Sequence, residues 1–523
     1  MAEGSRIPTV KRRQSGTPAG GQAQGANTGR RRLPRPALIV VLLLVLFGGM
    51  SNSLTGCATE RLSFSSVMLG GGPPPALDQG AKTEFSRLEQ KFDSLAQPSS
   101  SRQVQIDHMA DAFRRVRADY VYDVSDGKLI NAAIDGLNKL EPKPGGLPPE
   151  QVAEAALDSM LASLDPHSAY LNPQEFKDSQ IATSGEFGGL GIEINMEDGL
   201  VRVISPIEDT PAYRAGLKAG DFITHVDGTP IKGMTLREAV RHMRGKPGTD
   251  IELTIQRGDR QPFQVTITRD VIRVRPIKWR VEGDIGVIRV TQFIHRTEDE
   301  LEKAYRAMRK AGGPNLRGIV LDLRNNPGGL LNESVAVADA FLQSGPIVSV
   351  RDRSGVSRDF DAHRGDITHG LPIVVLINSG SASASEIVAG ALQDSHRATV
   401  FGARSFGKGS VQTITPLEWD GALRLTTALY YLPSGRSIQG NGIVPDIKVV
   451  SEEPGPERHE SDDPHAIHGS NVLPTKSAAS LPEKACPAPP VEKTDKVLGC
   501  ALAFLDAGSQ ENFLAQMAAE RNL

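Results

Sequence analysis

Apolar residues recur with different periods along the chain, and each period predicts a different kind of structure. Residues 103–183 carry apolar side chains at helical spacing, as at Met109, Phe113 and Val116, which predicts an N-terminal helical region. Over 184–272 the period shortens to that of strands, interrupted by one longer helical pattern at 236–243. A small β-rich domain is therefore expected between two regions of other character.

Strand and helix patterns alternate between residues 273 and 450. Apolar runs at 285–290, 318–323 and 373–378 are separated by amphipathic helical stretches. This order is typical of an α/β domain with a largely parallel sheet. Functional side chains are then expected near the carboxyl ends of its strands.

The N-terminal part of the chain has the pattern of a membrane anchor. Residues 1–36 hold eight Lys or Arg against one acid, and the uncharged stretch 37–56 follows directly. Basic residues before an apolar segment predict a cytoplasmic tail, with the rest of the chain exported. The strongly apolar part is short, so a cleaved signal peptide and a signal anchor both stay open.

Cys57 offers a second mode of membrane attachment. The sequence Leu54-Thr55-Gly56-Cys57 resembles a bacterial lipobox, in which the cysteine is acylated. The alternative is a chance cysteine at the end of an anchor. We therefore expect the protein in the bacterial cell envelope, on the periplasmic side of the inner membrane, held by the anchor or as a lipoprotein through Cys57.

Two stretches of low complexity are interpreted as linkers. Residues 57–102 and 451–493 are rich in Pro, Ser and other small or polar residues. An amphipathic pattern returns at 494–523, where C-terminal helices are expected to dock on the folded body. Cys486 and Cys500 could form a disulfide in an oxidising compartment.

Composition adds limits on size and partners. A chain of 523 residues with 39% hydrophobic and 23% charged residues has room for about three domains plus tails. The formal net charge of −3 gives no reason to expect a nucleic-acid partner.

A run of small residues and serines follows the predicted strand at 373–378. Ser381 and Ser383 precede the helix expected from Ser385 onward, and Ser385 is its first residue. A strand-to-helix turn can expose a hydroxyl beside free helix N–H groups, which suits nucleophilic catalysis with anion stabilisation. Helix capping is the competing explanation, since Ser383 and Glu386 have the spacing of a capping box.

Lys408 is the candidate base for such a serine. It lies between two glycines that let the backbone bend it inward, and burial can keep its amine neutral. No histidine obviously completes a triad, and His396 is interpreted as a surface residue at a helix end.

Two other motifs around Lys408 fit less well. The spacing Gly402 to Lys408 approaches a phosphate loop, but Gly409 replaces the metal-binding Ser or Thr and a strand pattern follows. Ser405 and Lys408 have the Ser-x-x-Lys spacing of penicillin-recognising enzymes, which requires a helix that Gly407 disfavours.

Together these motifs closely resemble the carboxyl-terminal processing (tail-specific) serine proteases. The resemblance spans about residues 105–450 and includes Asp165-Pro166-His167-Ser168 and Arg324-Asn325-Asn326-Pro327-Gly328-Gly329. It implies an α/β protease core of the ClpP/crotonase-like type, a mixed sheet with helices, joined to an N-terminal helical region and a membrane segment.

The same resemblance implies roles for individual residues. Ser383 is the implied nucleophile and Lys408 the base, while Gln412 orients the lysine amine. Backbone N–H groups of Gly329 and Ala384 are implied to form the oxyanion hole. Arg324 and Asn326 are interpreted as residues that stabilise the turn, and Ser381 or Ser385 stays open as an alternative nucleophile.

The inserted β-rich domain resembles a PDZ domain. The resemblance rests on Gly189-Leu190-Gly191-Ile192 and on the segment 215–228. Glycines at such a turn expose N–H groups that can hold a carboxylate, and the strand after them offers an edge to a peptide. A purely structural β-barrel with glycine turns is the alternative.

The expected function is that of an exported serine endopeptidase. It would recognise protein or peptide substrates with apolar C-termini through the PDZ domain and cleave them without metal or other cofactor. A non-catalytic PDZ scaffold at the membrane surface is the alternative. A homo-oligomer or an adaptor partner stays open.

Overall fold

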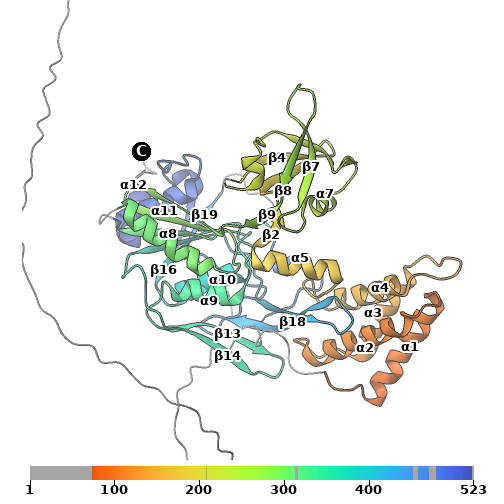
Figure 1. Cartoon of the computed structure of the whole chain (residues 1–523). Helices are drawn as coiled ribbons and strands as arrows, with labels where there is room; N and C mark the ends of the chain where they lie inside the picture. The colour runs from red at the N-terminus through yellow and green to blue at the C-terminus, as the bar shows by residue number, and fades with distance from the viewer. Residues whose placement is uncertain are drawn as a thin grey trace, which may run out of the picture. The chain divides into compact units, whose positions relative to one another are not determined.

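The computed structural model describes residues 74–207, 209–312, 316–451, 457–469, 477 and 479–520 (Figure 1). Among these residues, no helix is both long and apolar enough to cross a bilayer. The predicted basic tail 1–36, the apolar segment 37–56 and Cys57 lie outside the described residues, and membrane attachment stays a prediction.

Four helices at the start of the described chain share one hydrophobic core, which confirms the predicted helical region. Met109, Phe113 and Leu129 are fully buried in this core. The first helix begins inside the predicted linker 57–102, because its Phe85 and Phe92 pack into the same core. The helices are α1 (Gln79–Leu95), α2 (Arg102–Asp119), α3 (Asp126–Asn138) and α4 (Pro149–Ala162).

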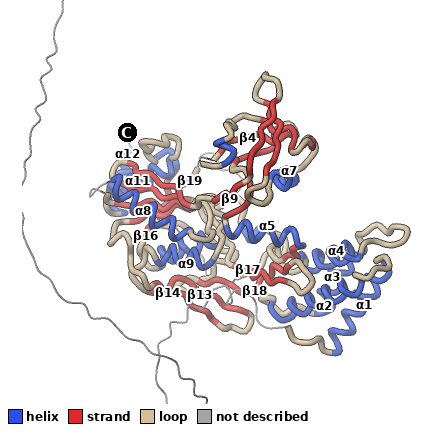
Figure 2. Tube along the Cα trace, in the orientation of Figure 1, coloured by secondary structure: helices blue, strands red, loops and turns tan. Residues whose placement is uncertain are grey.

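A separate β-rich unit follows α5 (Pro173–Ser184) and has its own core. Strands dominate this unit, whereas helices dominate the N-terminal region (Figure 2). The main sheet has the order β3-β4-β5-β7-β8, so β3 is an edge strand. Its elements are β2 (Glu186–Gly189), β3 (Ile192–Glu197), β4 (Leu200–Pro206), α6 (Pro211–Arg214), β5 (Phe222–Val226), β6 (Thr229–Pro230), α7 (Leu236–Met243), β7 (Asp250–Gln256), β8 (Phe263–Thr268) and β9 (Asp270–Arg273).

Within the described residues, seven strands form the central sheet in the order β10-β11-β12-β15-β16-β19-β20. The first pair is antiparallel and the other neighbours are parallel, in agreement with the predicted α/β core. The strands are β10 (Ile277–Glu282), β11 (Ile285–Val290), β12 (Gly318–Asp322), β15 (Ile373–Ile377), β16 (Ala398–Gly402), β19 (Ile447–Val450) and β20 (Ala479–Pro482).

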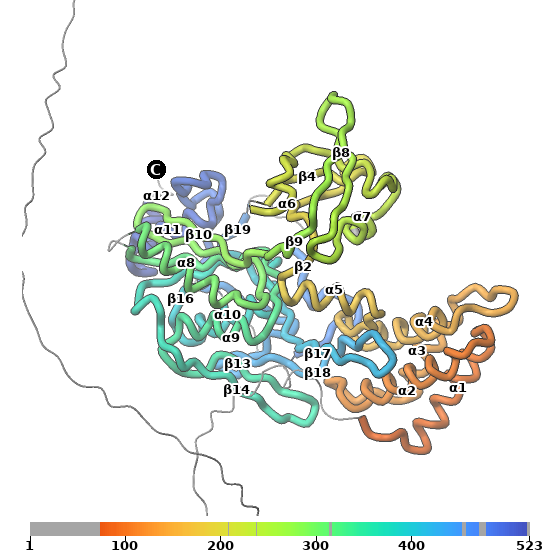
Figure 3. Tube along the Cα trace, viewed as in Figure 1, coloured from red at the N-terminus to blue at the C-terminus, as the bar shows by residue number. Residues whose placement is uncertain are grey.

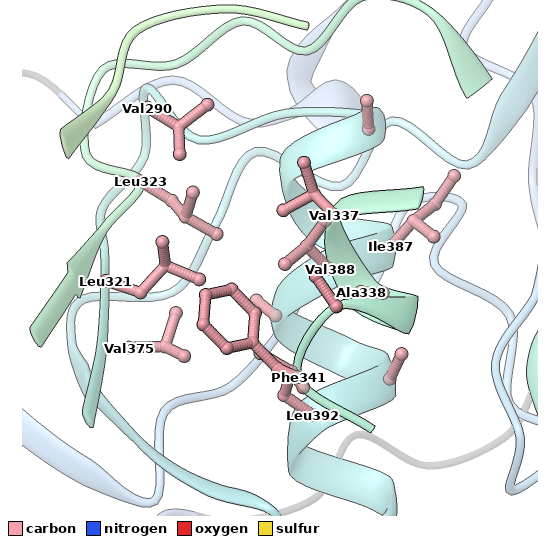
Figure 4. Packing of buried hydrophobic residues seen from close by; sticks show 14 of the residues in the cluster. Val290, Leu321, Leu323, Val337, Ala338, Phe341, Val375, Ile387, Val388 and Leu392 are labelled. Carbon is pink, nitrogen blue, oxygen red and sulfur yellow. The ribbon is translucent and has the colours of Figure 1, made fainter. Parts of the chain in front are cut away.

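Helices cover both faces of this sheet. Successive strand residues point to opposite sides, so apolar strands present two apolar faces that must both be covered. Ile319 and Leu321 belong to the core beneath α8 (Thr297–Gly312), α9 (Leu331–Asp339) and α10 (Ala384–Asp394). Figure 4 shows Leu321 and Val375 from the strands directed toward the helices. Val320 belongs to the opposite core, which α11 (Lys496–Ala507) and α12 (Gln510–Glu520) complete.

A second, antiparallel sheet joins the α/β core to the helical region. Its long strand, β18, contributes Leu423, Leu425 and Leu429 to the core of the N-terminal helices. The sequence pattern indicates only β17 among its strands. The strands are β1 (Ala169–Leu171), β13 (Gly345–Asp352), β14 (Ser357–Ala362), β17 (Ser410–Pro416) and β18 (Ala422–Tyr431).

The stretch 451–493 contains ordered elements where the sequence pattern predicts a linker. β20 pairs with β19 and extends the central sheet, and the 3₁₀ turn η3 (Glu460–Asp462) lies close to Lys408. Cys486 and Cys500 form a disulfide. The chain's C-terminal helices thereby return to the central sheet (Figure 3). The many Pro and Ser residues favour a linker in this stretch, because local composition carries no information on contacts with residues far along the chain.

Candidate active site

Ser383 occupies the turn between β15 and α10 in a backbone conformation that residues other than glycine rarely adopt. Its φ is +55° and its ψ is −114°, and such a conformation costs roughly 1–3 kcal/mol and is found preferentially at functional sites. The residue is 9% exposed. Its N–H donates to the Glu386 side chain at 2.7 Å, as in the capping box that the spacing predicts, but the Glu386 N–H donates to the Ser383 carbonyl at 2.8 Å and not to its hydroxyl. The hydroxyl therefore stays available for chemistry.

The two neighbouring serines use their hydroxyls for structure. Ser381 Oγ donates to the Leu323 carbonyl at 2.8 Å, and Ser385 Oγ donates to the Asn326 carbonyl at 2.9 Å. Both serine side chains are completely buried. These bonds tie the turn to the adjacent loop after β12, and they distinguish Ser383 from its two competitors.

Glu386 joins the serine turn to the lysine segment. Its carboxylate is completely buried and accepts the backbone N–H of Ser383 (2.7 Å), Gly407 (2.7 Å) and Lys408 (2.9 Å) together with the Ser405 hydroxyl (2.5 Å). The Ser383 and Lys408 N–H groups bind the same oxygen, Oε2. Burial raises the pKa of Glu386 to about 7, although the four hydrogen bonds act to lower it.

Lys408 and Gln412 lie together, as the resemblance implies. Lys408 Nζ donates to Gln412 Oε1, and Gln412 Nε2 donates to Ser410 Oγ at 2.9 Å and to Thr426 Oγ1 at 3.3 Å. Burial lowers the pKa of Lys408, although the nearby carboxylate of Glu460 acts to raise it. In this arrangement of the described side chains, no hydrogen bond joins Lys408 Nζ to Ser383 Oγ.

Gly328 and Gly329 bring the loop after β12 against the serine turn. A Cβ added at Gly328 would lie 2.7 Å from the Ala382 carbonyl oxygen and 2.9 Å from Ser383 Cβ, and its φ of +100° also favours glycine. Within the described chain, the N–H groups of Gly329 and Ala384 have no acceptor. Two free donors therefore lie near the serine, where an oxyanion hole requires them.

Asparagines fix this loop to the turn. Asn325 and Asn378 exchange two hydrogen bonds of 2.9 Å, and Asn326 accepts the Gly328 N–H with its side chain at 2.9 Å. Arg324, at the start of the loop, donates to Asp322. The expected turn-stabilising contribution of Arg324 and Asn326 is thus visible in their contacts.

A buried network behind Gln412 was not assigned a role from the sequence. Asp165 accepts the Ser168 hydroxyl at 2.6 Å and the Thr426 hydroxyl at 3.0 Å, and Thr426 reaches Gln412. His167 contacts Glu460 at 2.9 Å. The Asp-Pro-His-Ser motif signalled the first part, whereas Glu460 falls in a stretch that composition assigns to a linker.

In the β-rich unit, the edge strand β3 follows a turn with free backbone N–H groups. In the described chain, the N–H groups of Leu190 and Gly191 have no acceptor, and Gly191 has a φ of +77°. Ile192 begins the edge strand β3, and it is half-buried against the same core as Val240 of α7. The turn and edge strand expected at Gly189 to Ile192 therefore pack against the same core as helix α7.

Metal and phosphate sites find no support in this region. Among the described residues, no group of three or more His, Cys, Asp or Glu side chains is arranged to hold a metal ion. Lys408 is followed by strand β17, whereas a phosphate loop leads into a helix.

Comparisons with known proteins place these motifs in context. The sequence profile of Peptidase family S41 matches residues 284–449, and that of a PDZ domain matches residues 188–267. A carboxy-terminal-processing protease of Bartonella bacilliformis is 53% identical over 363 residues, covering 69% of this chain and 78% of that protein.

More distant relatives include a probable CtpA-like serine protease of Staphylococcus aureus. It is 36% identical over 403 residues, covering 76% of this chain and 75% of that protein. Among solved structures, a photosystem II D1 C-terminal processing protease is similar with 29% identity and a TM-score of 0.42, covering 67% of this chain and 93% of that chain.

Proposed function

Because the chain belongs to peptidase family S41, as a carboxy-terminal-processing serine protease with a PDZ domain, we propose that Ser383 and Lys408 cleave tails captured by that domain. One observation carries the residue assignment. Glu386 Oε2 accepts the backbone N–H groups of both Ser383 and Lys408, so a single buried atom holds nucleophile and base segments together.

Acylation begins when Lys408 turns from Gln412 toward the Ser383 hydroxyl. Catalytic hydrogen bonds are often long or absent without substrate and shorten once it is bound. The neutral amine takes the hydroxyl proton while Oγ attacks the peptide carbonyl carbon. The N–H groups of Gly329 and Ala384 stabilise the resulting oxyanion.

The tetrahedral intermediate then breaks down to an acyl-enzyme. The peptide C–N bond breaks, and the Lys408 ammonium gives its proton to the leaving amine, which departs with the C-terminal fragment. Water attacks the ester carbon of the acyl-enzyme while Lys408 accepts a water proton. Ser383 leaves with that proton, and the second product carries a new carboxylate.

Substrate capture is assigned to the PDZ domain. A peptide strand adding to β3 would place its C-terminal carboxylate near the free N–H groups of Leu190 and Gly191. Ile192 and Val240 line the side where an apolar terminal side chain would pack. A similar domain, the PDZ domain of a carboxy-terminal protease from Vibrio cholerae, was solved in complex with a peptide.

Export to the cell envelope completes the proposal. The basic stretch 1–36 before the uncharged stretch 37–56 supports insertion with the protease outside the cytoplasm. The Cys486–Cys500 disulfide also supports this location, since disulfides persist in oxidising compartments.

The residue assignment is tested with full-length protein in detergent and an unfolded substrate that ends in apolar residues. Ser383→Ala and Lys408→Ala should each lower kcat by at least about 10³-fold. Ser379→Ala on the same turn serves as the matched control and should keep its activity. A fluorophosphonate probe should label Ser383, as read by mass spectrometry of the peptide.

Labelling of Ser381 or Ser385 would reject Ser383 as the nucleophile. An acidic replacement of the last two substrate residues tests tail capture separately. The acidic tail should raise KM for this substrate and leave its kcat unchanged. Equal KM for apolar and acidic tails would reject capture by the C-terminus.

A further inference from the structure

Asp495 lies beyond the residues that the protease family profile matches, yet it contacts a loop of the candidate active site. The family match ends at residue 449, and Asp495 is the N-cap residue of α11. Its side chain is 17% exposed and faces Arg324. A residue from the C-terminal segment thereby reaches the loop that carries Gly328 and Gly329.

Arg324 is held between two carboxylates. Its Nε and Nη2 donate to Asp322 at 2.8 Å each, while Nη1 and Nη2 donate to Asp495 at 2.8 and 2.6 Å. Paired bonds of this kind fix the plane of the guanidinium as well as its position. The Arg324 backbone N–H also binds Asp322, at 3.0 Å, so the start of the loop is fixed from both sides.

The loop between Arg324 and Gly329 has little room for movement. At Gly328 even an added methyl group would lie 2.9 Å from Ser383 Cβ. Gly329 follows, and its N–H is one of the two free donors near the serine. A small shift at Arg324 would move this donor relative to the nucleophile.

Asp495 is itself anchored, so it can act as a fixed point. Its Oδ1 accepts the Leu498 N–H of α11 at 3.0 Å. The disulfide between Cys486 and Cys500 connects the segment before Asp495 to α11. Leu498 and other residues of α11 pack into the core on the sheet face opposite α9 and α10.

We infer that Asp495 is a positioning residue for the protease reaction, and that it acts through Arg324 to hold the loop bearing Gly329. The C-terminal segment is then part of the active-site framework. This inference rests on the proposed placement of Gly329 in the oxyanion hole.

The test separates the contact with Arg324 from the cap of α11. Asp495→Asn keeps an N-cap oxygen, since Asn caps helices as well as Asp, but it loses the charged paired contact. Asp495→Ala loses both. Glu492→Gln is the control, because Glu492 is 55% exposed and pairs with Arg280 at 3.0 Å in the same segment.

Each full-length variant is measured for kcat, KM and the denaturant midpoint of unfolding. Asp495→Asn should lower kcat about tenfold with little change in KM, because small displacements of reacting groups cost large rate factors. Glu492→Gln should match the parent. A purely structural role would lower the midpoint and leave kcat of the folded protein unchanged.

A double-mutant cycle with Arg324→Met decides whether Asp495 acts through Arg324. Adding Asp495→Asn to Arg324→Met should lower kcat no further. A second tenfold loss, or parental kcat in Asp495→Asn, would overturn the inference. Parental kcat in Arg324→Met would overturn it too, and would also count against the proposed oxyanion loop.

Discussion

The two sides of the candidate catalytic pair are built in opposite ways. The Ser383 turn is fixed by the hydroxyls of Ser381 and Ser385, by Glu386, and by Gly328 packed against it. The Lys408 amine lies at the end of a flexible side chain and donates a hydrogen bond to Gln412. Folding thus sets the position of the candidate nucleophile, whereas the proposed mechanism requires the candidate base to move.

Because of this difference, substitutions at the serine turn and substitutions near the lysine should affect activity in different ways. A change at the serine turn should disturb geometry that the fold has already fixed, at a large cost in rate. A change at the lysine should alter how often and in which protonation state the amine reaches the serine. The two classes of variant should therefore differ in size and in pH dependence.

Gly328→Ala should have the largest effect on activity. The new methyl group would crowd Ala382 and Ser383 and would occupy a φ of +100°. We expect kcat to fall about 10³-fold, since the nucleophile and an oxyanion donor are both displaced. Gly355→Ala has a similar φ of +79° with open space around it, so it controls for backbone strain alone. Equal losses in the two variants would show that crowding is not the cause.

The buried carboxylate of Glu386 should make stability depend on pH. Its folded pKa is raised by burial from 4.5 to about 7, so its contribution is fully present below pH 4.5 and is lost as pH rises through about 7. The loss should be on the order of 3 kcal/mol, at 1.36 kcal/mol per pH unit. Denaturant unfolding of the parent and of Glu386→Gln at several pH values would measure the slope.

The comparison of slopes, not of absolute stabilities, decides this prediction. Glu386→Gln also loses the hydrogen bonds that one carboxylate oxygen accepts, because the amide nitrogen cannot accept them, so its stability falls at every pH. Its slope between pH 4.5 and 7 should nevertheless become shallower than that of the parent. Glu492→Gln, an exposed carboxylate, should keep the parental slope. An unchanged slope in Glu386→Gln would contradict the assignment.

Local sequence could predict much of the candidate site, because its motifs are short and lie at strand ends. Ser383 lies on a strand-to-helix turn, and Lys408 lies two residues before strand β17, as the pattern indicates. The resemblance already favoured Ser383 among the three serines, and the structure adds that the hydroxyls of Ser381 and Ser385 are engaged in hydrogen bonds. Periodicity carries no information on such partners.

Long-range contacts explain where the sequence interpretation was wrong. β20 forms because Ala479–Pro482 pairs with β19, and Glu460 is buried because His167 and Gln439 bind it. Both lie in a stretch rich in Pro and Ser, where local pattern favours a linker. The contact from Asp495 to Arg324 spans 171 residues, a distance at which no local pattern in one sequence is informative.

Gln412→Leu should test the lysine side with a smaller effect. The amine would lose its acceptor, and we expect kcat to fall about tenfold with KM nearly unchanged, because substrate capture lies elsewhere. Thr413→Val is the matched control, since Thr413 is adjacent on the strand and bonds to Thr427 at 2.7 Å. A larger loss in Thr413→Val than in Gln412→Leu would indicate that strand β17 matters, and not the contact with the amine.

The smallest expected effect is a shift in the pH profile, with opposite signs at two positions. Burial lowers the pKa of Lys408 below its ordinary 10.5, so kcat/KM should rise with pH along a limb centred below that value. Gln412→Glu places a carboxylate at the amine and should move the limb up by about one pH unit. Glu460→Gln removes the charge that acts to raise the pKa of Lys408 and should move the limb down. Two shifts of the same sign would contradict Lys408 as the titrating base, because a single ammonium responds oppositely to a carboxylate gained and a carboxylate lost.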